Sequence, residues 1–275
     1  MRSETRKLIE KLEEVRKSTI VCMIYSKYAE MSREDAEIVF DVLSRTLEDG
    51  NEKVKRLELI LDSIGGDAGA AFKIVRVLRR FCEEFNVIVP EKAKSAATLV
   101  ALGSDKIYMT RLAELGPIDP IVSHPLMTGV MIPARAVQVF IDYVLPTILK
   151  RYGEVVADYF LKIDYNHVGF CRVSMEESEY YARALLETYH LKGKKREEID
   201  AIVKSLTRYP SHDFMIDYEL AREQLKLNVE LLPVEEEKLV WQLYRTYRQQ
   251  LNDVVLIVES RAHRRDIKRP KVTIW

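Results

Sequence analysis

An alternation of short apolar runs and amphipathic stretches between residues 19 and 109 constrains the fold most strongly. Runs rich in aliphatic residues, typical of buried strands, occur at 19–25, 56–63, 86–91 and 106–109. Stretches with apolar side chains at helical spacing lie between them, at 32–48, 69–81 and 95–104. Strands that alternate with helices are joined by crossover connections. The order therefore predicts a βαβαβαβ unit with a mostly parallel sheet covered by helices.

Helical patterns flank and interrupt this unit. Residues 1–17 are predicted to form an N-terminal helix, and residues 18–233 an α/β core with a helical insertion at about 133–208. Residues 234–261 carry aromatic and aliphatic side chains among charges. This pattern predicts one long C-terminal helix, followed by a basic tail to residue 275.

Composition limits the classes of function. Charged residues make up 31% of the chain, yet their formal net charge is zero, which argues against electrostatic binding of nucleic acid. The three cysteines lie far apart with no C-x-x-C pair, so we expect a reduced, cytoplasmic protein. The apolar runs are too short to span a bilayer, and the charged N-terminus lacks the apolar region of a signal peptide. Peripheral association with a membrane stays open.

Two loops follow predicted strands at the edge where parallel sheets place their chemistry: "DSIGGDAG" and "PEKAKS". In the first, Gly65 and Gly66 permit positive φ angles and outward-facing N–H groups, which can bind an anion or a developing oxyanion. The alternative is a strand-to-helix turn that needs glycine for its shape alone. The loop lacks the G-x-G-x-x-G spacing of a dinucleotide site.

Ser95 stands at the start of the helix predicted after the second loop. Its hydroxyl is suited to cap the free N–H groups of the first helical turn. Alternatively, it is a nucleophile, because Ala96 and Ala97 leave this helix start open and the N–H of Ala96 could stabilise an oxyanion.

Four blocks in order carry a resemblance to a known group. They are "LDSIGGDAG", "KSAATLVALGSDKI", "LGPIDP" and "YPSHDFMIDYELAREQLKLNV". The sequence is similar to the ClpP/crotonase-like superfamily and, more narrowly, resembles the serine dehydrogenase proteinase family, a relative of signal peptide peptidase A. The resemblance implies a β-α-β superhelix with a parallel sheet.

By this resemblance the protein is a serine peptidase that forms an acyl-enzyme on Ser95. Gly65, Gly66 and Ala96 would form the oxyanion hole, with no cofactor and no metal. Peptides or unfolded proteins would be the substrates, and the chain would form a homo-oligomer. Two departures from the family pattern stand out: Ile64 replaces the usual proline before the glycines, and Lys226 replaces a glycine near the end of a later helix.

The general base is not fixed by the sequence. Asp213 falls where the Clp protease subunit has its triad aspartate, and His212 beside it offers an imidazole of suitable pKa. "SHD" could equally close a turn through hydrogen bonds to the backbone. Relatives of signal peptide peptidase A use a lysine instead, and Lys150 lies at a comparable spacing after Ser95. Four other lysine and histidine side chains are further candidates for the base: Lys94, His124, Lys162 and His167.

Two other classes of function stay open beside a peptidase. A crotonase-type acyl-CoA enzyme also uses two N–H groups as an oxyanion hole, although it usually places acidic residues at the site. A catalytically weak member of the family would act as an assembly or binding module. The unassigned base and the replacement of proline by Ile64 are the two features that favour this alternative.

Overall fold

A seven-stranded sheet forms the centre of the computed structural model, which describes residues 2–47, 53–124, 127–153, 165–252 and 254–268. The strand order is β11-β10-β1-β2-β3-β5-β9, and all neighbours from β1 to β9 are parallel. The strands are β1 (Thr19–Tyr25), β2 (Val54–Asp62), β3 (Cys82–Val89), β5 (Lys106–Met109), β9 (Val229–Leu231), β10 (Leu256–Ser260) and β11 (Arg264–Ile267).

The predicted α/β class with a mostly parallel sheet is confirmed. Four predicted strands appear as β1, β2, β3 and β5, two of them with the predicted bounds. The three helices predicted between them are α2 (Asp35–Thr46), α3 (Ala68–Leu78) and α4 (Ala96–Leu102).

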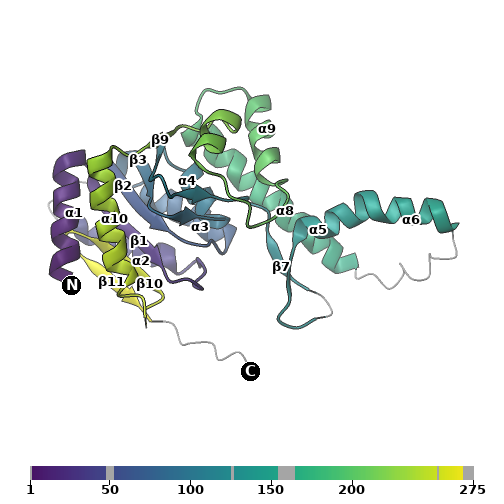
Figure 1. The fold of residues 1–275 in the computed structure, drawn as a ribbon, viewed down its shortest axis with the longest axis horizontal. Helices are drawn as coiled ribbons and strands as arrows, with labels where there is room; N and C mark the ends of the chain where they lie inside the picture. Colours follow the sequence, from purple (N-terminus) through teal and green to yellow (C-terminus); the bar gives the residue numbers. More distant parts are fainter. Residues whose placement is uncertain (1, 48–52, 125–126, 154–164, 253, 269–275) are drawn as a thin grey trace.

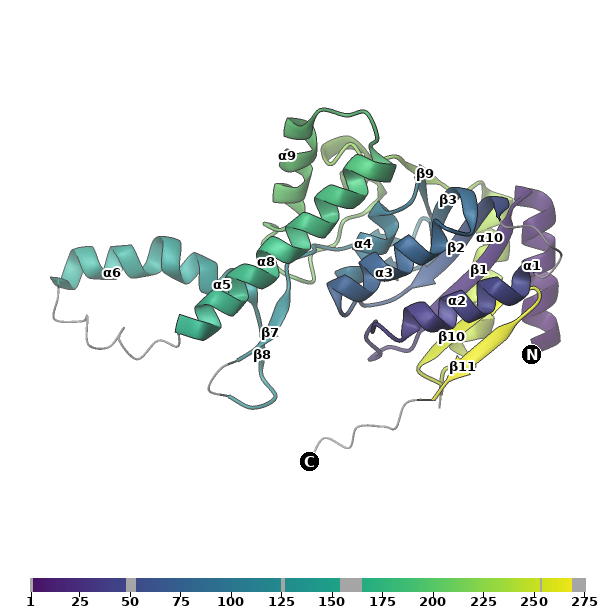
Figure 2. The ribbon, with the colours of Figure 1, turned by 180° about the vertical axis from the view of Figure 1, so that it is seen from behind.

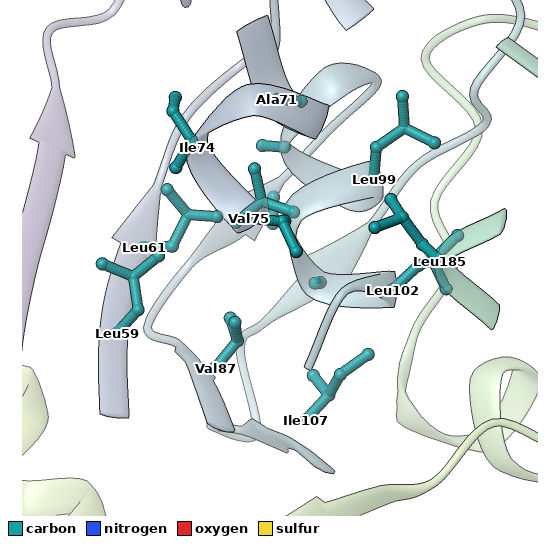
Figure 3. Close-up of a cluster of buried hydrophobic side chains, with 14 of the residues drawn as sticks. Leu59, Leu61, Ala71, Ile74, Val75, Val87, Leu99, Leu102, Ile107 and Leu185 are labelled. Atoms are coloured by element: carbon teal, nitrogen blue, oxygen red, sulfur yellow. The ribbon is translucent and has the colours of Figure 1, made fainter. Parts of the chain in front are cut away.

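Helices cover both faces of the sheet because its strands alternate apolar residues to either side. In β1, Val21 and Met23 join the larger core, whereas Ile20 and Cys22 join a second cluster. Helices α2, α3 and α4 pack in the larger core (Figure 2), and Figure 3 shows side chains of α3 and α4 there, against those of β2, β3 and β5. Two helices lie side by side over the second cluster, α1 (Arg2–Arg16) and α10 (Val234–Arg248) (Figure 1).

Most of residues 134–206 is helical: the end of this range packs against the larger core, whereas residues 134–152 extend away from the sheet as an arm (Figures 1 and 2). A hairpin of β7 (Ile121–Ser123) and β8 (Met131–Pro133) leads into it. The helical segments that follow are α5 (Ala134–Val139), the π-helix η1 (Phe140–Val144), α6 (Leu145–Tyr152), α8 (Tyr165–Leu185), the π-helix η3 (Leu186–His190) and α9 (Arg196–Leu206). Among the described residues, no helix is both long enough and apolar enough to cross a membrane.

The single long helix predicted for residues 234–261 is wrong. Helix α10 ends at Arg248, and residues 256–260 form β10, which pairs antiparallel with β1. The run "VVLIVES" is dense in β-branched residues, and β10 is buried throughout, so pairing in the sheet prevails over helical continuation. Part of the predicted basic tail is strand β11, in which Arg264 forms ion pairs with Glu259 and Asp266.

Candidate active site

Four segments lie side by side at the carboxyl end of the central sheet. Strand β4 (Lys92–Ala93) pairs in parallel with β6 (Glu114–Leu115). Ser63 pairs with Ala93 on one side, and Leu115 pairs antiparallel with Ile216 on the other. Because the first three segments are parallel, the residues that follow them, Gly65, Ser95 and Asp119, lie at the same end of this row. The fourth segment is antiparallel, so His212, which precedes it, lies at that end too. Residues far apart in the sequence thus meet at one edge.

Ser95 has a backbone conformation that few residues other than glycine adopt. Its φ is 51° and its ψ is −120°, and its side chain does not cap α4. Among the described residues its hydroxyl makes no hydrogen bond, so the N-cap interpretation does not apply. Such a conformation costs about 1–3 kcal/mol and persists where the surrounding structure holds it. A strained strand-to-helix turn is also how α/β hydrolases present a nucleophilic serine.

Gly65 and Gly66 pack too closely against their neighbours to carry a side chain. Their φ angles are 109° and 141°. A Cβ on Gly65 would lie 2.7 Å from the Cβ of Ser95 and 3.1 Å from the amide nitrogen of Ala96. A Cβ on Gly66 would lie 2.3 Å from the amide nitrogen of Met31. Gly65 therefore lies directly against the backbone on both sides of Ser95, at Lys94 and Ala96, whereas Gly66 lies against Met31.

The amide groups around this turn differ in their hydrogen bonds. The Gly65 N–H donates to the Ser63 hydroxyl at 3.0 Å, and the Gly65 carbonyl accepts from the Met31 N–H at 2.7 Å. Within the described ranges, the N–H groups of Gly66 and Ala96 donate to no other residue. Of the three groups predicted to form an oxyanion hole, these two have amides that are not already engaged.

His212 contacts a carboxylate, but not the one expected from the sequence. Its Nδ1 lies 3.1 Å from Oδ1 of Asp119, and both side chains are largely buried, with 15% and 6% of their surfaces exposed. Asp213 is exposed, and its carboxylate has no partner among the described residues. The residue beside His212 is therefore Asp119, which follows the nucleophile helix in the sequence block "GPIDP".

The lysine candidates lie away from the Ser95 hydroxyl or are engaged elsewhere. Lys150 is exposed on α6, in the arm (Figures 1 and 2). Lys94 directs its ammonium to Glu114 at 3.0 Å and to the Phe214 carbonyl at 3.2 Å. Lys162 lies outside the described residues.

The remaining histidine candidates belong to the insertion. His124 follows β7 in the hairpin, where its N–H donates to the Val130 carbonyl at 2.7 Å. His167 lies on α8, and its Nε2 is 3.5 Å from the Sγ of Cys171. Of the candidates for the base, His212 is therefore the one whose segment lies in the same row of strands as Ser95.

Two buried side chains, Thr98 and Asp62, form hydrogen bonds that connect the segments of the site. The Thr98 hydroxyl lies 2.7 Å from the Ala93 carbonyl oxygen and accepts from the Gly116 N–H at 3.1 Å, which ties β4 to the segment leading to Asp119. At the end of β2, Asp62 accepts from the Lys92 N–H at 3.2 Å and from the Tyr244 hydroxyl at 3.3 Å. Burial, reinforced by the nearby carboxylate of Glu91, raises the pKa of Asp62 to about 7.

The first half of the chain matches a known protein family. Residues 1–136 match the family of ClpP-like SDH-type serine proteinases. This match confirms the resemblance found in the sequence, and it includes the Gly-Gly turn, Ser95 and Asp119. The family supports assignment to the serine hydrolases. The matched range ends before His212, so the position of His212 near Ser95 is known from the fold alone.

The chain is also similar to individual proteins. Uncharacterized protein MJ0137 of Methanocaldococcus jannaschii is 28% identical over 253 residues, which is 87% of this chain and 78% of that protein. Uncharacterized protein MJ1495 of the same organism is 26% identical over 231 residues, 79% of this chain and 68% of that protein.

Two solved structures are also similar to the chain. A mutant of the 1510-N membrane-bound stomatin-specific protease has a TM-score of 0.45 at 17% identity, covering 75% of this chain and 77% of its own. A ClpP1 mutant from Listeria monocytogenes has a TM-score of 0.45 at 15% identity, covering 82% of this chain and 99% of its own.

Proposed function

We propose that this protein is a serine peptidase that cleaves peptide bonds through an acyl-enzyme on Ser95. The observation that carries the proposal is the strained backbone of Ser95, held against the Gly-Gly turn with no side chain between them. A serine that only began a helix would not need a positive φ angle, and its hydroxyl would be free to cap the first turn.

The chemistry follows from the neighbours of Ser95. The Ser95 hydroxyl oxygen attacks the carbonyl carbon of the scissile bond, while its proton passes to Nε2 of His212. The N–H groups of Gly66 and Ala96 donate to the oxyanion, and Gly65 allows the close approach of the two loops. The C–N bond then breaks, the departing amine takes the proton from His212, and water hydrolyses the ester by the same route.

The hydroxyl of Ser95 has no hydrogen bond to His212 in the free protein. Catalytic hydrogen bonds are often long before substrate binds and shorten in the complex. The strand register that joins Ala93, Leu115 and Ile216 supports an approach of the two side chains, because it brings both segments to one edge.

We further propose that peptides or unfolded proteins are the substrates and that the chain acts as a homo-oligomer. A backbone amide is the bond that the proposed site is suited to cleave, and the match of residues 1–136 to a family of serine proteinases supports this proposal. The arm offers apolar residues for association, since Val139, Tyr143 and Val144 are exposed on it.

Hydrolysis of a fluorescently labelled unfolded protein tests the proposal. We expect the wild type to cleave it and Ser95→Ala to lose that activity. Ser205→Ala is the matched control, because Ser205 is exposed on α9, and it should cleave like the wild type. Equal cleavage by the wild type and Ser95→Ala would refute the proposal. Turnover of an acyl-CoA thioester without peptide cleavage would support a crotonase-type enzyme instead.

A further inference from the structure

The contact between His212 and Asp119 assigns a role that the sequence alone does not. We infer that Asp119 is the positioning residue for His212, holding its Nδ1–H so that Nε2 faces the Ser95 hydroxyl. This inference rests on the proposed function. It replaces Asp213, the expected carboxylate, with one that lies 93 residues before His212 in the chain.

The electrostatics of the pair favour this role. The Asp119 side chain is 6% exposed, and a buried carboxylate is costly unless a hydrogen-bond donor compensates it. The imidazole Nδ1–H at 3.1 Å supplies that donor. With Nδ1 carrying the proton, the neutral imidazole has its lone pair on Nε2, which is the acceptor that a general base needs. The carboxylate would also stabilise the imidazolium that forms when Ser95 gives up its proton.

The backbone around both partners is fixed. On one side of Asp119 the Ile118 N–H donates to the Leu206 carbonyl at 3.0 Å, and on the other the Pro120 carbonyl accepts from Ala134 at 2.8 Å. The loop that carries His212 is tied to the nucleophile loop, because the ammonium of Lys94 donates to the Phe214 carbonyl. A positioning residue must itself be held in place, and these bonds restrain the backbone on both sides of Asp119 and join the His212 loop to the loop that carries Ser95.

The order of the two roles along the chain is exchanged relative to the Clp protease subunit. In the Clp protease subunit the histidine follows the nucleophile helix and the aspartate comes later. Here the aspartate follows that helix, and the histidine comes from the later segment. Because the two segments flank the same hydrogen bond, exchanging the residues preserves the arrangement of base and carboxylate. Triads are recognised by geometry and roles, and their order along the chain varies between folds.

The test compares three variants by their rate of labelling with a fluorophosphonate probe and by kcat and KM on the unfolded-protein substrate. Asp119→Asn should lower labelling rate and kcat by about 10²- to 10⁴-fold and leave KM nearly unchanged, because the amide cannot hold the correct tautomer. Asp119→Glu should recover part of the loss. Asp213→Asn tests the competing carboxylate, and we expect its rates to stay within about twofold of the wild type.

A spectroscopic measurement on the wild type makes the test independent of how the variants fold. Nitrogen-15 NMR of labelled protein at neutral pH should show His212 as the Nδ1–H tautomer. An Nε2–H tautomer would overturn the inference, as would a folded Asp119→Asn that labels at the wild-type rate, or a loss that follows Asp213→Asn. Failure of the proposed function has a different signature: Ser95→Ala and the wild type would then label or cleave alike.

Discussion

Adding one methyl group at Gly65 should disable Ser95 while leaving the fold in place. In Gly65→Ala the new Cβ would lie 2.7 Å from the Ser95 Cβ and 2.8 Å from the Lys94 carbonyl oxygen. Nonbonded carbons prefer about 3.5–4.0 Å, so Ser95 must move by roughly 1 Å. A displacement of that size costs about 10²-fold in rate.

The same substitution should lower the free energy of unfolding. A positive φ costs an L-residue about 1–2 kcal/mol, and overpacking adds about 1–3 kcal/mol, so the total is roughly 2–5 kcal/mol. Urea denaturation measures the stability, and the rate of fluorophosphonate labelling measures the nucleophile.

Gly193→Ala separates the two contributions. Gly193 also has a positive φ, 91°, but a Cβ there would meet nothing within 4 Å. It should lose only about 1–2 kcal/mol of stability and label at the wild-type rate. If Gly65→Ala labels as fast as Gly193→Ala, the packing of the Gly-Gly turn against Ser95 does not control the site, and the reasoning is refuted.

Three further predictions concern the groups that support the site and the fold. Thr98→Val leaves the Gly116 N–H and the Ala93 carbonyl without their hydroxyl partner, so urea denaturation should show a loss of about 1–3 kcal/mol; an unchanged midpoint would contradict this. Burial lowers the pKa of His190 to about 4 from 6.5, so the unfolded chain binds a proton that the native state excludes. Wild-type stability should fall by up to about 3 kcal/mol relative to His190→Gln as pH drops from about 6.5 to 4, and parallel stability curves for the two proteins would count against it. The pH dependence from Asp62 has the opposite sign, because burial raises its pKa to about 7 from 3.8 and the native state keeps a proton that the unfolded chain loses. The free energy of unfolding of the wild type should therefore fall as pH rises from about 4 to 7, and Asp62→Asn should not show this decrease.

The strands and helices of the core could be predicted because each is specified by its own residues. The runs at 19–25 and 106–109 match β1 and β5, since alternating and continuous apolar patterns are local signals. Ser95 could be identified as a candidate from the motif around it. Its positive φ angle could not be predicted, because no local pattern of residues around Ser95 specifies it.

Other parts depend on contacts that no local pattern contains. The pairing of His212 with Asp119 needs the register that places Ile216 beside Leu115, and a spacing of 93 residues gives no periodic signal. The end of α10 at Arg248 was missed for a related reason. Residues 256–260 are a strand because β1 has an open edge to pair with, and this edge is a property of the folded sheet.

The central claim, that Ser95 is the nucleophile, is tested most directly by locating a covalent adduct. The protein would be treated with a fluorophosphonate, digested and mapped by mass spectrometry. We predict a single phosphonyl group on the peptide that contains Ser95, and its absence after prior unfolding of the protein or in Ser95→Ala. An unmodified Ser95 peptide, or an adduct on another serine of the native protein, would contradict the account.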